Sequence, residues 1–320
     1  MIDSTTIPPT QRPDRVIQTV HTLVNRRLCR DHYRLTFRLS KFPPAQAGQF
    51  VHLSPARRPE ESSQTSHDRW ASDLNLPMLR RAFSIAGLRR TNTGVEVDVI
   101  YRVVGTATRW MESLRAGDPV SLLGPMGNCF PISDRKPLAW LVAGGVGLPP
   151  MLWLAAALHD TAKSVVAFCG AQTHDLLALT LDPAAQPDPG ARAATPSATE
   201  FTDCGANMVI STDDGSLGFR GYVGSAMAAY HQANPLDPDD LVVYTCGPEP
   251  MIRFVAEYCV ARRIECYVCV ERNMACGTGM CQSCVVPVRD TADPEGWSYR
   301  LCCTDGPIFE ARDILWETPD

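Results

Sequence analysis

Cysteines near the carboxyl end constrain this chain more than any other feature. They are Cys276, Cys281 and Cys284, followed by the adjacent pair Cys302 and Cys303. Intervals of four and two residues with a distant fourth cysteine are typical of the thiolates that hold a plant-type [2Fe–2S] cluster. Gly277 and Gly279 lie between the first two cysteines, where a loop around an inorganic core needs positive φ angles and close backbone approach. The pattern predicts an iron–sulfur site.

Two questions stay open at these cysteines. A four-thiolate zinc knot that holds a small tail together is the alternative to a cluster. Cys302 and Cys303 are neighbours, and neighbouring side chains on an extended segment point to opposite sides. We therefore expect only one of the two to be a ligand, and their spacing does not choose between them.

Length and composition limit the classes of protein to consider. A chain of 320 residues that is 45% hydrophobic can bury a full core and is expected to form two or three domains. A formal net charge of −5 does not indicate the basic surface that nucleic-acid-binding proteins present. No apolar run reaches the roughly 18 residues of a membrane span. The first residues lack the features of a signal peptide. We expect a cytoplasmic protein whose 13 cysteines serve metal or redox chemistry.

The first part of the chain has the pattern of a β-domain. Candidate strands span residues 16–24, 33–39, 48–53 and 95–103. Short strands separated by Gly and Pro predict an antiparallel β-barrel, which we assign to residues 15–135. Residues 1–14 are expected to be unstructured. Residues 54–76, rich in Ser, Arg, Glu and Pro, are expected to form an inserted surface loop.

The next part alternates strands and helices. Candidate strands span residues 138–143, 164–169, 208–211, 241–245 and 264–270, and candidate helices span 149–159, 221–232 and 250–262. This alternation predicts a doubly wound parallel sheet, assigned to residues 136–263 with a solvated insertion at 181–199. Residues 264–320 are expected to form the cluster subdomain. Cys266 and Cys269 face opposite sides of a strand and are expected to be packing residues.

Two segments of the barrel carry candidate binding groups. Arg80-Arg81-Ala82-Phe83-Ser84 offers a guanidinium for a pyrophosphate, an aromatic side chain for a flat ring and a hydroxyl for a ring nitrogen. Ile100-Tyr101-Arg102 is followed by Gly105-Thr106-Ala107-Thr108, a small-residue turn into a helix whose free N–H groups favour a phosphate. The alternative for the first segment is an ordinary exposed strand. The alternative for the second is a strand–turn–helix corner without a binding role.

Two turns of the α/β part predict a nucleotide site. Gly144-Gly145-Val146-Gly147 follows a buried strand and opens a helix, the context in which glycines let a dinucleotide pyrophosphate approach. Thr245-Cys246-Gly247-Pro248 stands at the carboxyl end of a strand, where open α/β sheets bind ligands. A small buried hydrophobe is the alternative role of Cys246. Phe168–Gln172 has no clear ribose-reading acid or phosphate-reading arginine, so NAD and NADP both stay open.

Seven segments follow one another in a recognisable order. They are Arg81–Ser84, Tyr101–Gly105, Gly124–Asn128, Ala143–Gly147, Thr212–Gly215, Cys246–Pro248 and Met274–Phe309. Over about residues 15–312 this order resembles the electron-transfer subunit of class 1B dihydroorotate dehydrogenase. The cysteine tail, with Thr304-Asp305-Gly306-Pro307 after the last cysteine, is the most family-specific part. The flavin and nucleotide segments are shared across the ferredoxin-reductase superfamily.

The resemblance implies an FAD-binding β-barrel, an NAD-binding α/β domain and a short [2Fe–2S] subdomain. It carries the FAD contacts to Arg81, Ala82, Phe83, Ser84, Ile100, Tyr101, Arg102, Ala107 and Thr108. The two turns described above place the NAD(H) site at Gly144, Gly145, Gly147, Cys246, Gly247 and Pro248. By the same resemblance, Cys276, Cys281, Cys284 and Cys303 hold the cluster. Cys303 lies 19 positions after Cys284, a long interval for the family, so the connecting hairpin is expected to be extended.

The implied function is electron transfer in pyrimidine biosynthesis. Electrons from FMN on a separate catalytic subunit, which oxidises dihydroorotate, reach NAD⁺ through the cluster and FAD, in an assembly of two copies of each subunit. The base for dihydroorotate then belongs to the partner, and this chain supplies no catalytic acid or base. NADH carries a hydride and a cluster takes single electrons, so a flavin is needed between them.

Two other functions compete with this one. The reductase component of an oxygenase would share the FAD and NAD domains. From Arg272 to the end, however, there are only 49 residues, too few for a complete plant-type ferredoxin domain. The second competitor is a non-catalytic, zinc-stabilised binding protein.

Overall fold

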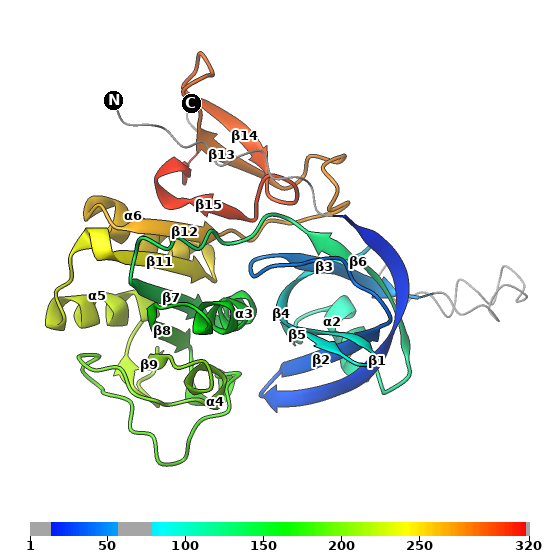
Figure 1. Ribbon diagram of the computed structural model, residues 1–320, viewed down its shortest axis with the longest axis horizontal. Coiled ribbons are helices and arrows are strands. Elements are labelled where there is room, and N and C mark those ends of the chain that lie inside the picture. Colours follow the sequence, from blue (N-terminus) through cyan, green and yellow to red (C-terminus); the bar gives the residue numbers. More distant parts are fainter. Residues whose placement is uncertain (1–13, 57–78, 318–320) are drawn as a thin grey trace, which may run out of the picture.

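The structure is a computed structural model that describes residues 14–56 and 79–317 (Figure 1). The expected unstructured segment 1–14 and inserted loop 54–76 lie outside these ranges, except at their ends. A β-barrel and a helix-covered sheet stand side by side, and a small hairpin rises from the edge of the sheet (Figure 1).

The barrel is closed by six strands in the order β1-β2-β5-β4-β3-β6. They are β1 (Val16–Cys29), β2 (His32–Leu39), β3 (Phe50–Pro55), β4 (Arg81–Thr91), β5 (Gly94–Arg102) and β6 (Pro119–Met126). Helix α2 (Thr106–Ser113) follows β5. Alternating side chains such as Leu35, Phe37, Val97 and Val99 fill the interior. The predicted antiparallel barrel is confirmed.

The second sheet has the order β10-β9-β8-β7-β11-β12-β15. Its strands are β7 (Leu138–Gly144), β8 (Ser164–Ala171), β9 (Asn207–Thr212), β10 (Phe219–Arg220), β11 (Leu241–Cys246), β12 (Glu265–Cys269) and β15 (Ile308–Glu310). All neighbours pair in parallel except β12 and β15, which are antiparallel. The predicted doubly wound sheet is confirmed.

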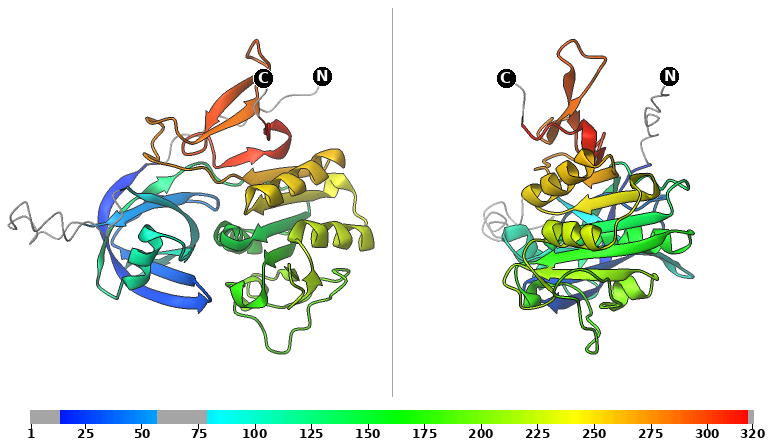
Figure 2. Two further views of the ribbon diagram at one scale, coloured as in Figure 1. Left: turned by 180° about the vertical axis from the view of Figure 1, so that it is seen from behind. Right: turned by 90° about the vertical axis from the view of Figure 1, so that its left-hand side faces the viewer.

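Helices cover both faces of this sheet (Figure 2). On one face α5 (Val223–Ala233) and α6 (Glu249–Ala261) pack on a shared apolar core. On the other face α3 (Leu148–His159) lies between the sheet and the barrel, and the short α4 (Thr199–Thr202) packs nearby. Cys266 belongs to the first core and Cys269 to the second. They pack on opposite faces, as predicted.

The segment at residues 181–199 differs from the expected solvated insertion. Thr195 forms an antiparallel bridge with Met208 on the sheet, and Leu181 bridges Ala198. Ala191 and Ala198 are fully buried. The expectation was wrong for the second half of the segment, because small alanine side chains let its backbone pack closely on the sheet, and composition alone does not reveal such packing.

The carboxyl-terminal part contributes to both the sheet and a separate hairpin. β13 (Val285–Arg289) and β14 (Trp297–Leu301) pair antiparallel between the third cysteine and the last two. The extended hairpin expected from the long interval is therefore present. β12 and β15 lie within the expected cluster subdomain 264–320 but belong to the main sheet. The cluster segment is thus a long excursion between two strands of that sheet.

Among the described residues, no helix combines the length and the apolar character needed to cross a membrane.

Replacing Phe201 by Ala tests how firmly the end of the 181–199 segment is anchored. The Phe201 ring is fully buried in the core beside α3, so Phe201→Ala is expected to lower the free energy of unfolding by about 3–5 kcal/mol. Ile17→Ala, at a side chain that is 69% exposed, is the matched control and should change stability little. Denaturant unfolding of both variants measures this, and equal stabilities would contradict the anchoring.

Candidate functional site

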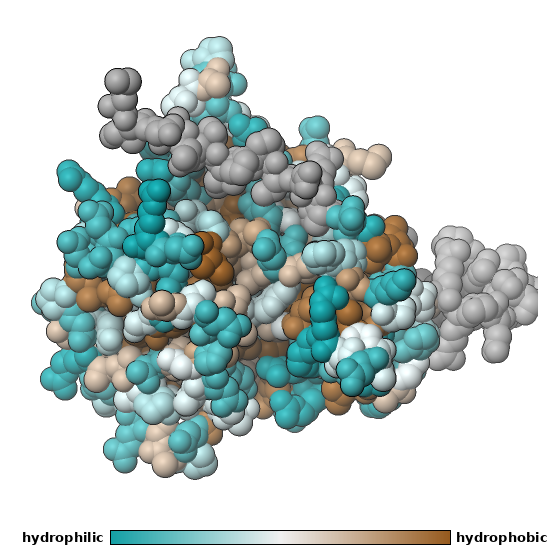
Figure 3. Space-filling view, viewed as in Figure 1, coloured by the Kyte–Doolittle hydropathy of each residue, from teal (hydrophilic) through white to brown (hydrophobic). Residues whose placement is uncertain are grey.

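A cavity of about 1380 Å³ lies between the barrel and the carboxyl ends of the parallel strands. Its walls come from β4, β5 and the start of α2 on one side, and from the turns after β7, β8, β11 and β12 on the other. On the face shown in Figure 3, apolar residues lie where the barrel meets the α/β half, among polar residues. The cavity is therefore shared by the two halves of the molecule.

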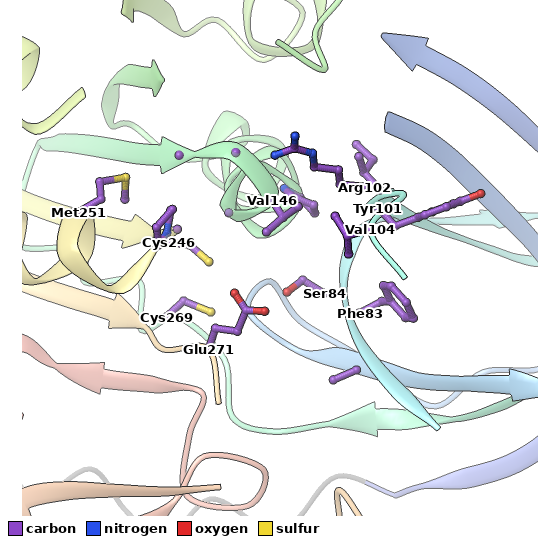
Figure 4. A pocket seen from close by; sticks show the side chains of 18 of the residues that line it. Phe83, Ser84, Tyr101, Arg102, Val104, Val146, Cys246, Met251, Cys269 and Glu271 are labelled. Carbon is purple, nitrogen blue, oxygen red and sulfur yellow. The ribbon is translucent and has the colours of Figure 1, made fainter. Parts of the chain in front are cut away.

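Every residue that the sequence analysis assigned to FAD or NAD(H) lines this cavity. From the barrel and α2 these are Arg81, Ala82, Phe83, Ser84, Ile100, Tyr101, Arg102, Ala107 and Thr108, and from the α/β half they are Gly144, Gly145, Gly147, Cys246, Gly247 and Pro248. Figure 4 shows labelled barrel residues, among them Ser84 and Arg102, facing labelled residues of the α/β half such as Cys246. The fold thus brings two distant sets of predicted residues to one place.

The aromatic wall of the barrel is fixed by packing and one hydrogen bond. Tyr101 stacks on Tyr33 with ring centroids 5.7 Å apart and meets Phe83 edge-on at 6.3 Å. Its hydroxyl donates to Asn25 Oδ1 at 3.1 Å. Burial raises the pKa of Tyr101, so this hydroxyl stays protonated. A flat ligand would therefore meet a preformed aromatic surface.

The start of α2 is held by its own first turn. Thr108 Oγ1 accepts hydrogen bonds from the backbone N–H groups of Val104 (2.9 Å) and Gly105 (3.1 Å). Val104 to Thr108 all line the cavity. The helix N-terminus is thus directed at the cavity, as the predicted phosphate-binding corner requires.

The glycine turn after β7 packs directly on the turn after β11. Residues Gly145–Gly147 form a 3₁₀ turn, and Gly145 has a φ of +52°. A Cβ at Gly147 would lie only 2.0 Å from the carbonyl oxygen of Cys246. Glycine is needed here because no side-chain atom fits between the two turns. Their backbones together form the floor that a dinucleotide could approach.

The first two cysteines of the tail form one pair. Cys276 Sγ accepts hydrogen bonds from the backbone N–H groups of Thr278 (3.3 Å) and Cys281 (3.4 Å). Burial opposes ionisation of Cys276, but hydrogen bonds from Thr278 and Cys281 outweigh it and lower the pKa to about 6. Gly277 and Gly279 have φ angles of +70° and +89°, as predicted. The loop thus stabilises a thiolate.

The other two cysteines form a second pair. Cys303 and Cys284 are both buried, and burial, followed by the neighbouring Cys284, raises the pKa of Cys303 to about 12. Cys302 Sγ instead donates to the carbonyl oxygen of Val270 at 3.2 Å. The structure therefore turns Cys303, and not Cys302, toward another predicted ligand.

The four predicted cysteines supply the donor atoms that an iron–sulfur cluster uses. Within residues 14–56 and 79–317, no three His, Cys, Asp or Glu side chains converge to hold a single ion. The four predicted cysteines form two pairs, and a [2Fe–2S] cluster takes two thiolates on each iron. Four thiols on one loop therefore fit, in number and chemistry, the ligand set of a [2Fe–2S] cluster.

The segment after Cys303 is tied to the barrel by one amide side chain. Asn128 Nδ2 donates to the carbonyl oxygens of Asp305 (3.0 Å) and Ile308 (2.9 Å), and Asn128 Oδ1 accepts from the Ile308 N–H at 2.9 Å. The Asn128 N–H donates to Gly306 O at 2.7 Å. These bonds connect the Gly124–Asn128 segment to the end of the cysteine tail.

His52 on β3 lies against the cluster loop. Its ring is fully buried, and a Cβ built at Gly277 would meet ring atom Cε1 at 2.6 Å. Burial, and then the charges of Arg80 and Arg81, lower its pKa to about 4. The sequence analysis gave no histidine a function, because the seven histidines show no metal-ligand spacing.

Comparison with known proteins identifies the family. Residues 271–315 match the iron–sulfur cluster binding domain of dihydroorotate dehydrogenase B, and residues 141–257 match the oxidoreductase NAD-binding domain. The dihydroorotate dehydrogenase B (NAD(+)) electron transfer subunit of Streptococcus mutans is 32% identical over 272 residues, which cover 84% of this chain and 87% of the relative. The Geobacillus kaustophilus subunit is 33% identical over 274 residues, with the same coverages.

This chain belongs to the dihydroorotate dehydrogenase B electron transfer subunits. The resemblance inferred from its motifs is thereby confirmed.

Solved structures show that the family fold is widespread. An NADH-dependent reduced ferredoxin-NADP oxidoreductase matches with a TM-score of 0.69 at 22% identity, over 93% of this chain and 90% of that one. A Neisseria gonorrhoeae ferredoxin NADP⁺ reductase with bound FAD and NADP matches with a TM-score of 0.53 at 14% identity, over 77% and 91%. At these identities the matches establish the ferredoxin-reductase-like fold of this electron transfer subunit.

Three residues that line the cavity were given no site role in the sequence analysis. Gln172, Asp213 and Glu271 each line the cavity just after the strands β8, β9 and β12. Burial, followed by the charge of Asp214, raises the pKa of Asp213. The carboxyl ends of parallel strands share one edge of a sheet, so the position of these residues after predicted strands was a usable signal.

Replacing Gly147 by Ala tests the close contact between the two turns. The added methyl group would overlap the Cys246 carbonyl, so Gly147→Ala is expected to destabilise the protein by about 1–3 kcal/mol. Gly87→Ala is the control, because its nearest non-bonded atom would lie at an ordinary 3.6 Å. Thermal unfolding compares them, and an unchanged Gly147→Ala variant would refute the contact.

Proposed function

We propose that this chain passes electrons between a dihydroorotate-oxidising, FMN-containing catalytic subunit and NAD⁺, through a [2Fe–2S] cluster and FAD, in pyrimidine biosynthesis. One observation carries the proposal. The same cavity is lined by the aromatic wall of the barrel, by the nucleotide turns, and by Met274, Ala275 and Ser283 of the cluster loop. A hydride carrier, a flavin and a one-electron carrier could therefore meet there.

The FAD site is proposed on the barrel side of the cavity. The preformed surface at Phe83 and Tyr101 would take the flat ring, the Ser84 hydroxyl would reach a ring nitrogen, and Arg81 with the start of α2 would hold the pyrophosphate. Ala82, Ile100, Arg102, Ala107 and Thr108 complete this proposed site. When bound, the flavin supplies chemistry that these side chains lack, since it exchanges electrons in pairs or singly.

The NAD(H) site is proposed on the opposite wall. Gly144, Gly145 and Gly147 would let the pyrophosphate approach the turn before α3, while Cys246, Gly247 and Pro248 would line the reacting end. These two turns pack on each other. Their contact would hold the nucleotide at a fixed distance from the barrel wall.

The cluster is proposed on Cys276, Cys281, Cys284 and Cys303. The pairing of these thiols and the N–H donors at Cys276 support the assignment. On this assignment Cys302 is a packing residue, held by its bond to Val270. None of the 13 cysteines forms a disulfide, which fits the reducing compartment of a cytoplasmic protein, and we propose that location. We also propose an assembly of two copies of this chain with two copies of the catalytic subunit.

Two adjacent cysteines allow a sharp test of ligation. Cys303→Ser is expected to remove the visible absorbance and the electron paramagnetic resonance (EPR) signal of the cluster, because it takes one of four thiolates away. Cys302→Ser, one position earlier, should retain both. Iron content, absorbance and EPR of the reduced proteins measure this. The reverse result would transfer the ligand role to Cys302, and a colourless wild-type protein with bound zinc would support the zinc knot.

Removal of the third cysteine tests the coupled activity. Cys284→Ser, assayed together with the catalytic subunit, should abolish NAD⁺-linked orotate formation, because the route between the two flavins loses its one-electron carrier. NADH oxidation with an artificial acceptor should persist, since it needs only the FAD and NAD(H) sites. Retention of the coupled activity in a variant that lacks the cluster would defeat the proposed function.

A further inference from the structure

His52 occupies the contact between the barrel and the cluster loop. It lies on β3, where the neighbouring Val51 points into the barrel core. Because side chains alternate along a strand, His52 points outward, and there it meets Gly277. The partner of His52 across the sheet is Ala82 on β4, within the proposed FAD segment. This one side chain therefore stands between the two proposed redox sites.

The flat face of the His52 ring packs against Gly277 of the cluster loop. A Cβ built at Gly277 would lie 2.6 Å from Cε1, 2.9 Å from Nε2 and 3.0 Å from Nδ1 of His52. Gly277 directly follows Cys276, and its positive φ of +70° bends the loop around this point. The absence of a side chain at this position lets the imidazole reach the backbone of the cluster loop.

Both ring nitrogens of His52 lack a hydrogen-bond partner in the described part of the chain. An imidazole always carries at least one N–H, and a fully buried N–H without an acceptor is unfavourable. Buried polar groups in native proteins are rarely left in this state. The unsatisfied donor therefore points to an acceptor that is supplied by a bound group beside the loop.

We infer that His52 donates a hydrogen bond to a sulfur of the cluster unit, either a bridging sulfide or the Cys276 thiolate. This inference rests on the proposed ligation of the cluster by Cys276 and its three partners. Sulfur accepts such bonds, and hydrogen bonds to the sulfurs raise the reduction potential of a cluster because they stabilise the added negative charge. His52 would therefore raise the reduction potential of the cluster. It is held in position by β3, which pairs with the β4 strand of the proposed FAD site.

Pulsed EPR tests the bond directly in the unmutated protein. The chain is produced with ¹⁵N only in its histidine rings, and the holoprotein is reduced with dithionite. The expected result is hyperfine coupling between the cluster and one imidazole nitrogen, which disappears in His52→Phe. His231→Phe is the control, since His231 on α5 bonds Tyr258 on α6, and it should keep the coupling.

The outcomes separate this inference from the proposed function. A cluster signal without imidazole coupling would overturn the inference and leave the function intact. The absence of any cluster signal would overturn the function itself. Coupling that survives in His52→Phe would assign the bond to another histidine and would also overturn the inference.

Redox titration of three variants provides an independent test. His52→Phe should lower the potential of the cluster, because it fills the space without a donor. His52→Gln places an amide N–H near the position of Nε2, and His52→Asn near that of Nδ1, so one of them should restore the potential toward the wild-type value. A purely structural role would leave the potential equal in all variants that retain the cluster, and that result would refute the bond.

Discussion

The apolar packing of α3 between the sheet and the barrel is the interaction on which the rest depends. Leu148, Met151 and Leu152 of α3 share one core with Ala86 and Ile100 of the barrel and with Ala139 and Leu141 of the sheet. The two walls of the cavity are therefore parts of one packed unit. Because protein interiors are close-packed, the barrel segment and the nucleotide turns keep their separation without help from a ligand.

The cluster segment depends on the same unit at both of its ends. It leaves the sheet after β12 and returns to it at β15, while Asn128 bonds the returning strand to the barrel. Cys303 is thus positioned by the sheet and by the barrel together, and the first cysteine pair is positioned against β3 through His52 and Gly277.

The features of the fold that could be predicted are those that depend on hydrophobic periodicity and on the spacing of motifs. The alternating strands, the helices on the sheet, the cavity-lining residues and the positive φ angles of Gly277 and Gly279 followed from local patterns. β6 was not predicted as a strand, because it contains two prolines and a glycine, and β4 was foreseen only as an alternative, an exposed strand at residues 80–84. The burial of Ala191 and the contact of His52 depend on which segments meet in space, and no local pattern encodes that. The prediction of Cys303 over Cys302 came only from the family resemblance.

The path of the chain through β12 and β15 has a consequence for assembly during translation. Strand β15 follows all the cysteines of the tail along the chain, so it is synthesised after them, and its pairing with β12 also draws the Cys303 segment back to the first three cysteines. Pairing of β15 with β12 therefore completes the sheet and closes the cysteine-containing loop in one step. The same pairing offsets the entropy cost of closing a loop of this length, so iron binding does not have to. A nascent chain should therefore become competent to accept iron only after β15 has been synthesised.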